Sequence, residues 1–323
     1  MFYIQKNDKP NIIEKTFNII KMQENKLFLP ITDKTSEKQN EKLAQKTNKI
    51  ISKYSNSKKI VISKKLQEET SYINYLNSYG LDISDGRWLY EILATDIIKY
   101  IIEKKKIKKE ETTISILIND LTEIELENIK ILAENYKSLN IVTNHIEKLK
   151  KLEDKFMENG IMITISNNKK KSLMKSKIIL NVDFPNELVN KYMIKEDAVI
   201  INVQGKVKIN KKRFNGLIIN NYEIDFRDDI KSEENLLGNE FYLRDVYEAR
   251  LYKRQTFAVV RKNLKRDGVV VKKVYLNNSV LWSKMLRDNS KKNKWWQMIW
   301  NNCFFGSIHD LRNSKFIFWG LFT

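Results

Sequence analysis

The chain has 323 residues, 42% of them hydrophobic, which favours a globular protein of two domains, or of one domain with extensions, over a disordered chain. Its formal net charge of +19 indicates either an anionic partner such as nucleic acid or a lysine-rich solvated surface. The single cysteine, Cys303, and the two histidines exclude an intramolecular disulfide bond and a zinc site made of cysteine and histidine alone.

The beginning of the chain has none of the features of a secretory signal, because residues 1–6 lack a charged lead followed by an apolar core. Apolar runs elsewhere are shorter than the roughly 18 to 20 residues that a membrane-spanning helix needs. We therefore expect a cytoplasmic protein without a transmembrane segment.

Residues 1–110 are expected to form a separate N-terminal α/β domain. Short apolar runs of the strand type alternate with helical patterns, and Gly80 stands where a helix C-terminal cap is expected. The charged run 104–111 is the expected linker to the next domain. The expected strands are 2–4, 27–29, 59–63 and 81–83, and the expected helices are 35–54, 68–79 and 88–102.

Arg87 is a candidate anion-binding residue of this domain. It is the only arginine before Arg213, and it follows Gly86 at the start of an expected helix. A guanidinium in that position suits an anionic ligand. The alternative is a turn in which Trp88 packs inward.

Residues 111–235 are expected to form a second α/β domain. Its strands alternate with helical patterns, which predicts a parallel sheet covered by helices on both faces. Ligands of such sheets bind at the carboxyl ends of the strands. The expected strands are 114–118, 141–143, 161–165, 178–182 and 198–203, with one more strand after 218.

The loop after the first of these strands lacks the glycines that a phosphate-binding loop needs. Residues 118–124 read Ile-Asn-Asp-Leu-Thr-Glu-Ile, so side chains and carboxylates occupy the space that a pyrophosphate would fill. Thr122 and Glu125 form a capping-box pattern, so the following helix can satisfy its own first N–H groups. Repulsion from these carboxylates makes ordinary dinucleotide binding improbable.

Residues 113–205 nevertheless resemble the NAD(P)-binding Rossmann domain of shikimate dehydrogenase and glutamyl-tRNA reductase, in the order and spacing of their strands. The resemblance implies that Asn144, His145 and Lys148, after the second strand, would meet the ribose and the 2′-phosphate of NADP. The alternative is that Asn144 caps the helix that follows it.

The same resemblance places three further residues beside the nicotinamide ring. Asn181 and Asp183 follow the fourth strand, and Gly205 follows the fifth. The alternative for Asp183 is a capping or turn role. The family has a catalytic pair of one lysine and one aspartate. Lys64, Lys65 and Asp85 are available here, but their spacing does not identify such a pair, so catalytic residues are not assigned. No metal site is expected.

Residues 236–281 are expected to form a basic extension of one or two helices over 240–265 and a strand over 269–276. Arg250, Arg254, Arg261 and Lys265 recur at helical spacing, as in a helix that tracks nucleic-acid phosphates. The alternative is a solvated outer face, because abundant Lys, Asn and Ile are also what an AT-rich coding sequence produces.

The Trp- and Phe-rich tail, 282–323, has no periodicity that indicates a fold. One hypothesis is that it is not a selected part of the fold, for instance through a shifted reading frame. The other is an amphipathic segment that lies on a membrane surface.

Three classes of function remain open. We expect a non-catalytic binding or scaffold protein that has lost its glycine-rich loop and that carries no cofactor, with its partner left open between a protein and nucleic acid. The alternatives are an NADP-dependent oxidoreductase of the shikimate dehydrogenase type and a nucleic-acid-binding protein.

Overall fold

A computed structural model describes residues 1–280, except 159, 161, 204, 206, 210–213, 228–238, 277 and 278. Residues 1–277 form one compact unit and residues 278–323 form a second. In the second unit the structure describes strand β13 (Ser279–Val280). The Trp- and Phe-rich tail, about which the sequence allowed two hypotheses, lies outside the described residues.

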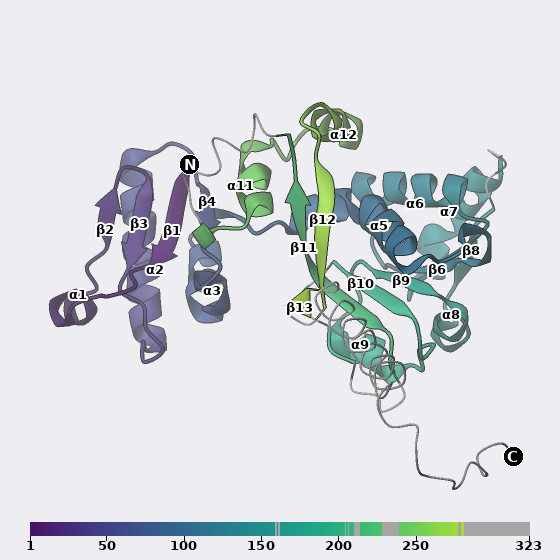
Figure 1. The fold of residues 1–323 in the computed structure, drawn as a ribbon, viewed down its shortest axis with the longest axis horizontal. Coiled ribbons are helices and arrows are strands. Elements are labelled where there is room, and N and C mark those ends of the chain that lie inside the picture. The colour runs from purple at the N-terminus through teal and green to yellow at the C-terminus, as the bar shows by residue number, and fades with distance from the viewer. Residues whose placement is uncertain are drawn as a thin grey trace, which may run out of the picture. The chain divides into compact units, whose positions relative to one another are not determined.

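The N-terminal part of the first unit contains a five-stranded sheet in the order β2-β3-β1-β4-β5 (Figure 1). Neighbouring strands are parallel except for β2, which is antiparallel to β3. The strands are β1 (Phe2–Lys6), β2 (Lys21–Gln23), β3 (Lys26–Leu29), β4 (Lys59–Ile62) and β5 (Asp82–Ser84).

The same N-terminal part contains three helices and one 3-10 turn. They are α1 (Ile12–Phe17), α2 (Glu37–Tyr54), η1 (Leu66–Glu68) and α3 (Thr70–Ser78). A capping box between Ser36 and Gln39 starts α2. The buried hydroxyl groups of Thr47 on α2 and Tyr72 on α3 are 2.8 Å apart, which satisfies both inside the core. Gly80 follows α3 with φ +73°, as the sequence predicts for a helix C-terminus.

The helix expected over 88–102 is two helices, α4 (Arg87–Ile92) and α5 (Ala94–Lys105). Leu93 separates them, with φ −89° and ψ 6°. Both helices bury their apolar residues, so a continuous apolar stripe did not reveal the break. The 3-10 turn η2 (Lys109–Glu111) lies in the charged run that follows.

The second sheet of the first unit has the strand order of a dinucleotide-binding domain. Its order is β12-β11-β10-β9-β6-β7-β8, and all neighbours are parallel except β11 and β12. Numbered from β6 to β11, this is the order 3-2-1-4-5-6 of a Rossmann sheet. The predicted α/β, Rossmann-like fold is therefore confirmed. The strands are β6 (Thr113–Leu117), β7 (Ser138–Val142), β8 (Thr164–Ser166), β9 (Ile178–Asn181), β10 (Val199–Asn202), β11 (Leu217–Asp225) and β12 (Val270–Leu276).

Helices cover both faces of this parallel sheet. Leu173 of α8 and Val189 of α9 share a core with Ile179, while Ile129 of α6 lies with Ile116 at the opposite face. Burial of the strands on both faces explains why most of their residues are apolar. The helices are α6 (Glu123–Asn135), α7 (Ile146–Glu158), α8 (Lys169–Lys175) and α9 (Asn186–Lys191).

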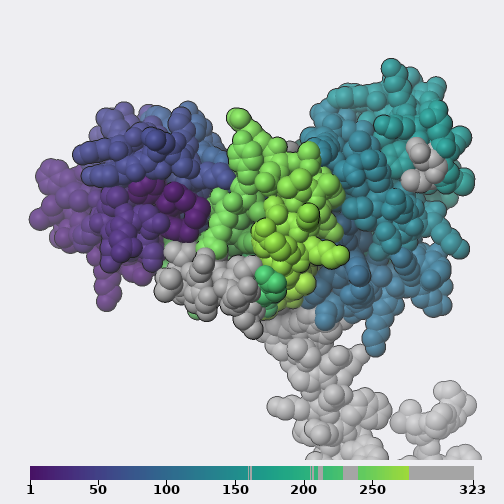
Figure 2. Space-filling model, turned by 90° about the horizontal axis from the view of Figure 1, so that it is seen from above, coloured from purple at the N-terminus to yellow at the C-terminus, as the bar shows by residue number. Residues whose placement is uncertain are grey.

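The basic extension forms two helices, α11 (Leu243–Arg250) and α12 (Phe257–Arg266), which precede β12. Helix α11 contacts β4 and β5 of the first sheet as well as α4 and β11. Figure 2 shows these green residues between the purple N-terminal segment and the blue-teal residues of the second sheet. The segment therefore joins the two sheets within the first unit.

Candidate functional site

The switch-point crevice, the space where strand order reverses between β6 and β9, is the place where a Rossmann sheet binds its ligand. The register pairs Leu117 with Asn181, so the loops that follow β6 and β9 leave the sheet side by side. Asn119 and Asp183 lie in these two loops. The site is therefore built from the ends of neighbouring parallel strands.

Asp183 closes this crevice with its carboxylate. Its Oδ2 accepts hydrogen bonds from the backbone N–H groups of Asn119, at 2.7 Å, and Asp120, at 3.0 Å. Burial raises the pKa of the Asp183 carboxyl, and these two hydrogen bonds oppose that rise. Paired backbone N–H groups at a loop are the donors that commonly hold a phosphate, so Asp183 occupies an anion position.

The Asn119 side chain forms hydrogen bonds that connect the loops after β6, β7 and β9. Its Nδ2 donates to Asp183 Oδ1 at 3.2 Å, and its Oδ1 accepts the backbone N–H of Asn144 at 2.9 Å. The amide side chain stands where a phosphate-binding loop has a glycine. These bonds hold the ends of β6, β7 and β9 without a ligand.

The start of α6 is also satisfied from within the chain. The backbone N–H of Thr122 donates to Glu125 Oε2 at 2.9 Å, and the Thr122 hydroxyl donates to the same oxygen. The capping box predicted from the sequence is therefore confirmed. Glu125 is buried and brings negative charge close to the crevice.

The residues that the resemblance assigned to the NADP ribose lie together at an open cavity of about 620 Å³. Asn144, His145 and Lys148 are all exposed there. The Lys148 ammonium forms an ion pair with Asp120, and this hydrogen-bonded pair lowers the pKa of the Asp120 carboxyl. The cavity is lined by Asp120, Asn144, His145, Ile146, Glu147, Lys148 and Asn167.

Asn181 and Gly205, which the resemblance placed beside the nicotinamide, are joined through Asn202. The buried Asn181 Nδ2 donates to Asn202 Oδ1 at 2.6 Å and to the Phe184 carbonyl at 2.9 Å. Asn202 Nδ2 donates to the Gly205 carbonyl at 2.7 Å. These contacts occupy the Asn181 amide and connect the ends of β9 and β10.

Arg87, the candidate anion-binding residue, is exposed at the first position of α4. Its Nε lies 3.3 Å from Asp85 Oδ2, so its nearest charged partner is a neighbour in the sequence. Gly86 precedes it with φ +77°, and a Cβ at this position would lie 2.5 Å from Arg244 Nε. The close approach of Arg244 accounts for the glycine.

Helix α11 buries three charged residues that sequence reasoning did not place in the interior. Arg244 Nε lies 2.9 Å from Asp245 Oδ1, and its guanidinium stacks 4.3 Å from the ring centre of Tyr242. Glu248 Oε2 accepts the backbone N–H of Leu89, at the start of α4, at 2.9 Å. Burial raises the pKa of Asp245 to about 6 and that of Glu248 to about 7. The Arg-Asp-x-x-Glu spacing carries no signal that distinguishes this interior role from a solvated face.

The candidate nucleic-acid residues do not share one helix. Arg250 ends α11, the exposed Arg254 lies in the connection, and Arg261 and Lys265 belong to α12. Both terminal nitrogens of the Arg261 guanidinium donate hydrogen bonds to the Asp96 carboxylate of α5. Arg261 therefore has a structural partner, whereas Lys265 is exposed.

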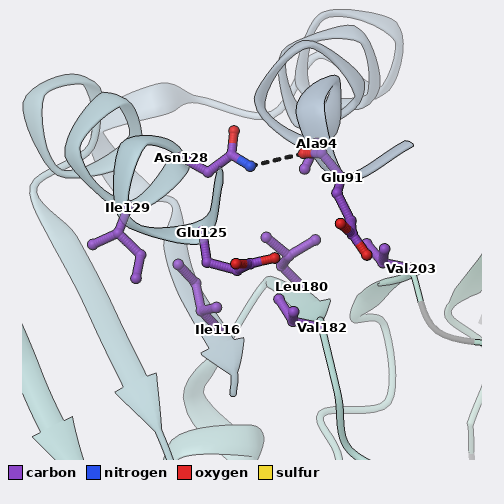
Figure 3. Close-up of a pocket in the computed structure, with 9 residues that line it drawn as sticks. All are labelled: Glu91, Ala94, Ile116, Glu125, Asn128, Ile129, Leu180, Val182 and Val203. Atoms are coloured by element: carbon purple, nitrogen blue, oxygen red, sulfur yellow. Dashed lines mark hydrogen bonds between the residues drawn. The ribbon is translucent and has the colours of Figure 1, made fainter. Parts of the chain in front are cut away.

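A second feature is a small pocket lined by residues of α4 and α6 (Figure 3). Glu91 and Glu125 both line it, and Asn128 Nδ2 donates to the Glu91 carbonyl at 2.7 Å. Burial, with the Glu125 charge, raises the pKa of Glu91 to about 7. The cavity is about 10 Å³, which is room for roughly one water molecule.

Comparisons with known proteins find remote structural likeness. No family model and no curated protein matches the chain. A phosphoglycerate oxidoreductase from Vibrio cholerae O395 has a TM-score of 0.33 at 10% identity, covering 82% of this chain and 99% of that one. A shikimate 5-dehydrogenase-like protein has a TM-score of 0.29 at 11% identity (82% and 97%). An aspartate transcarbamoylase from Trypanosoma cruzi has a TM-score of 0.26 at 9% identity (80% and 81%).

Two further observations concern other classes of site. Within the described residues, no three His, Cys, Asp or Glu side chains are grouped so that they could hold a metal ion. Every helix in that part of the chain is too short or too polar to cross a bilayer.

Proposed function

We propose that this is a Rossmann-type binding or scaffold protein that does not use its switch-point crevice for a dinucleotide. The observation that carries the proposal is the pair of hydrogen bonds from the Asn119 and Asp120 N–H groups to the Asp183 carboxylate. The Asp183 carboxylate thereby accepts the hydrogen bonds that a bound phosphate would accept, and the crevice serves to connect the loops after β6 and β9.

The electrostatic cost of replacing Asp183 by a phosphate supports this proposal. A pyrophosphate would have to displace a partly buried carboxylate and then remain near it. Two like charges about 4 Å apart repel by about 4 kcal/mol at a protein-surface dielectric. Micromolar binding releases about 8 kcal/mol, so the repulsion alone removes about half of the binding free energy of a typical cofactor.

An NADP-dependent oxidoreductase is the second candidate. The 3-2-1-4-5-6 strand order and the open cavity beside Asn144, His145 and Lys148 favour it. In this alternative the Asp183 side chain turns away from the loop when the cofactor binds. Nucleic-acid binding has less support, because Arg261 is held by Asp96.

A thermal-shift titration of the full chain with NADPH, NADH, ATP and a short RNA tests the proposal. Any ligand that binds the native state raises the melting temperature by mass action. We expect no shift with millimolar nucleotide for the unmodified protein. Asp183→Asn, which removes the charge and retains an acceptor, is compared with Glu187→Gln on the exposed surface of α9.

The outcomes separate the three classes of function. A shift with NADPH that disappears in Asn144→Ala and Lys148→Ala would replace the proposal with the oxidoreductase. A shift with RNA that disappears in high salt would replace it with nucleic-acid binding. A nucleotide shift that appears in Asp183→Asn but not in Glu187→Gln would show directly that the carboxylate blocks the crevice.

A further inference from the structure

Helix α1 has the reverse of the usual arrangement, with its acidic residue inside and its apolar residues outside. Ile12 is 81% exposed and Phe17 is 65% exposed, whereas Glu14 is 4% exposed. The Glu14 carboxylate accepts a hydrogen bond from Asn7 Nδ2 at 2.8 Å and pairs with Lys21 Nζ at 2.6 Å. These partners fix the rotation of α1, so its apolar side chains remain in solvent.

Exposed apolar residues occur on α1, after its end and on β2, which is the edge strand of the first sheet and is labelled in Figure 1. We call them the apolar tip: Ile12, Ile13, Phe17, Ile19 and Met22, each more than 40% exposed. Exposed large apolar side chains that are grouped rather than scattered often mark an interaction site.

A row of lysines on α2 contacts the end of α1 through its middle member, Lys46. At 100° per residue, five exposed lysines fall within about 80° of the helix circumference. Lys46 Nζ donates to the backbone carbonyls of Phe17 at 2.7 Å and Asn18 at 3.0 Å, so the row touches the end of α1. The acidic residues Glu37 and Glu41 lie on another flank of α2 by the same geometry. The lysine row is Lys38, Lys42, Lys46, Lys49 and Lys53.

We infer that the apolar tip and the lysine row form a docking surface for an anionic phospholipid membrane. Exposed isoleucine, phenylalanine and methionine side chains insert at the boundary between headgroups and acyl chains, and lysines beside them attract the negative surface. The charge of the row is complementary to such a surface.

A membrane fits these observations better than a protein partner does. A stable protein interface buries about 800 Å² on each side with close complementarity of shape. The tip side chains are too exposed to line a groove, and a bilayer receives protruding side chains without any complementary shape. An interfacial contact also needs no membrane-spanning helix.

Vesicle co-sedimentation of the full chain tests this inference. The probes are vesicles of phosphatidylcholine alone and vesicles of phosphatidylcholine with phosphatidylserine, whose anionic headgroups attract lysines near the surface. We expect binding to the anionic vesicles only. The double variants Ile12→Ser/Phe17→Ser and Lys42→Glu/Lys49→Glu should each lose at least about tenfold in affinity, because each removes one of the two contacts.

Matched variants elsewhere on the surface complete the experiment. Met162→Ser/Val259→Ser removes exposed apolar side chains, and Lys262→Glu/Lys265→Glu reverses exposed charges on α12. Both controls should bind like the unmodified protein, and all variants should keep its melting temperature. Equal binding to neutral vesicles, no binding at all, or full retention of binding by either test variant would overturn the inference. Binding of the tip to an acidic protein instead of vesicles would also overturn it.

Discussion

Asp183 and Glu248 are carboxylates that each accept a hydrogen bond from a backbone N–H group of a distant segment. A buried N–H group that loses its acceptor costs about 1 to 3 kcal/mol, so such a side chain can hold two segments in place. The residues next to each carboxylate in the sequence do not indicate which segment it contacts. The roles of Asp183 and Glu248 therefore became visible only in the folded chain.

Gly86 gives a prediction at the scale of one residue. Its φ of +77° strains any other residue, and a Cβ there would also meet Arg244 Nε at 2.5 Å. Gly160 has a similar φ of +71° but no atom within 4 Å of its Cβ position. We expect Gly86→Ala to lower the free energy of unfolding by at least about 1 kcal/mol more than Gly160→Ala, because only the first adds a clash to the backbone strain. Urea unfolding of the two variants measures the difference, and equal losses would contradict it.

At the scale of elements, most strands of the second sheet were predictable because its parallel strands are buried on both faces, whereas β2 was missed and the strand expected over 161–165 is β8, Thr164–Ser166. Runs such as 114–118 and 178–182 are apolar except for one residue each, Ser115 and Asn181, and each overlaps a strand. The break at Leu93 was missed, since no glycine or proline marks it. The orientation of α11 was also missed, because its buried charges depend on Tyr222 and Leu89, which come from other elements.

The pairing of α12 with α5 gives a prediction at this scale. Arg261 holds Asp96 through two nitrogens, and both side chains are about one-third exposed. A double-mutant cycle with Arg261→Ala and Asp96→Ala should give a coupling free energy of about 0.5 to 1 kcal/mol in urea unfolding. The same cycle with Lys265→Ala in place of Arg261→Ala should give none. A coupling free energy of zero between Arg261 and Asp96 would contradict this prediction. Arg261 would then be available to bind phosphates, as the nucleic-acid alternative requires.

At the scale of the whole molecule, several buried acids make stability depend on pH. Burial raises the pKa of Glu91 and of Glu248 from 4.5 to about 7, and that of Asp245 from 3.8 to about 6. At pH values between the unfolded-state pKa and the native-state pKa of each group, the native state binds more protons than the unfolded state. Stability from these groups is therefore greatest below about pH 4 and is lost as the pH rises towards 7.

The free energy of unfolding should consequently fall between pH 5 and pH 8 by an amount on the order of a few kcal/mol. Glu248→Gln and Glu91→Gln should each flatten this decline, because an amide does not ionise. Glu187→Gln, on the exposed surface of α9, should leave the slope unchanged. Denaturant unfolding at four pH values measures the slopes, and a stability that rises from pH 5 to pH 8 would contradict the assignment.

The contact between the N-terminal sheet and α11 has a consequence for the order of events during synthesis. Tyr3 and Val61 share a core with Phe241 and Val246, and the Lys64 N–H donates to the Glu240 carbonyl. Those partners leave the ribosome long after the first strands do. One side of the first sheet therefore lacks the residues that cover it until almost the whole of the second sheet has been translated. Contacts so distant in the chain form slowly, and a nascent chain stopped before residue 239 is the species in which we expect chaperone binding to be strongest.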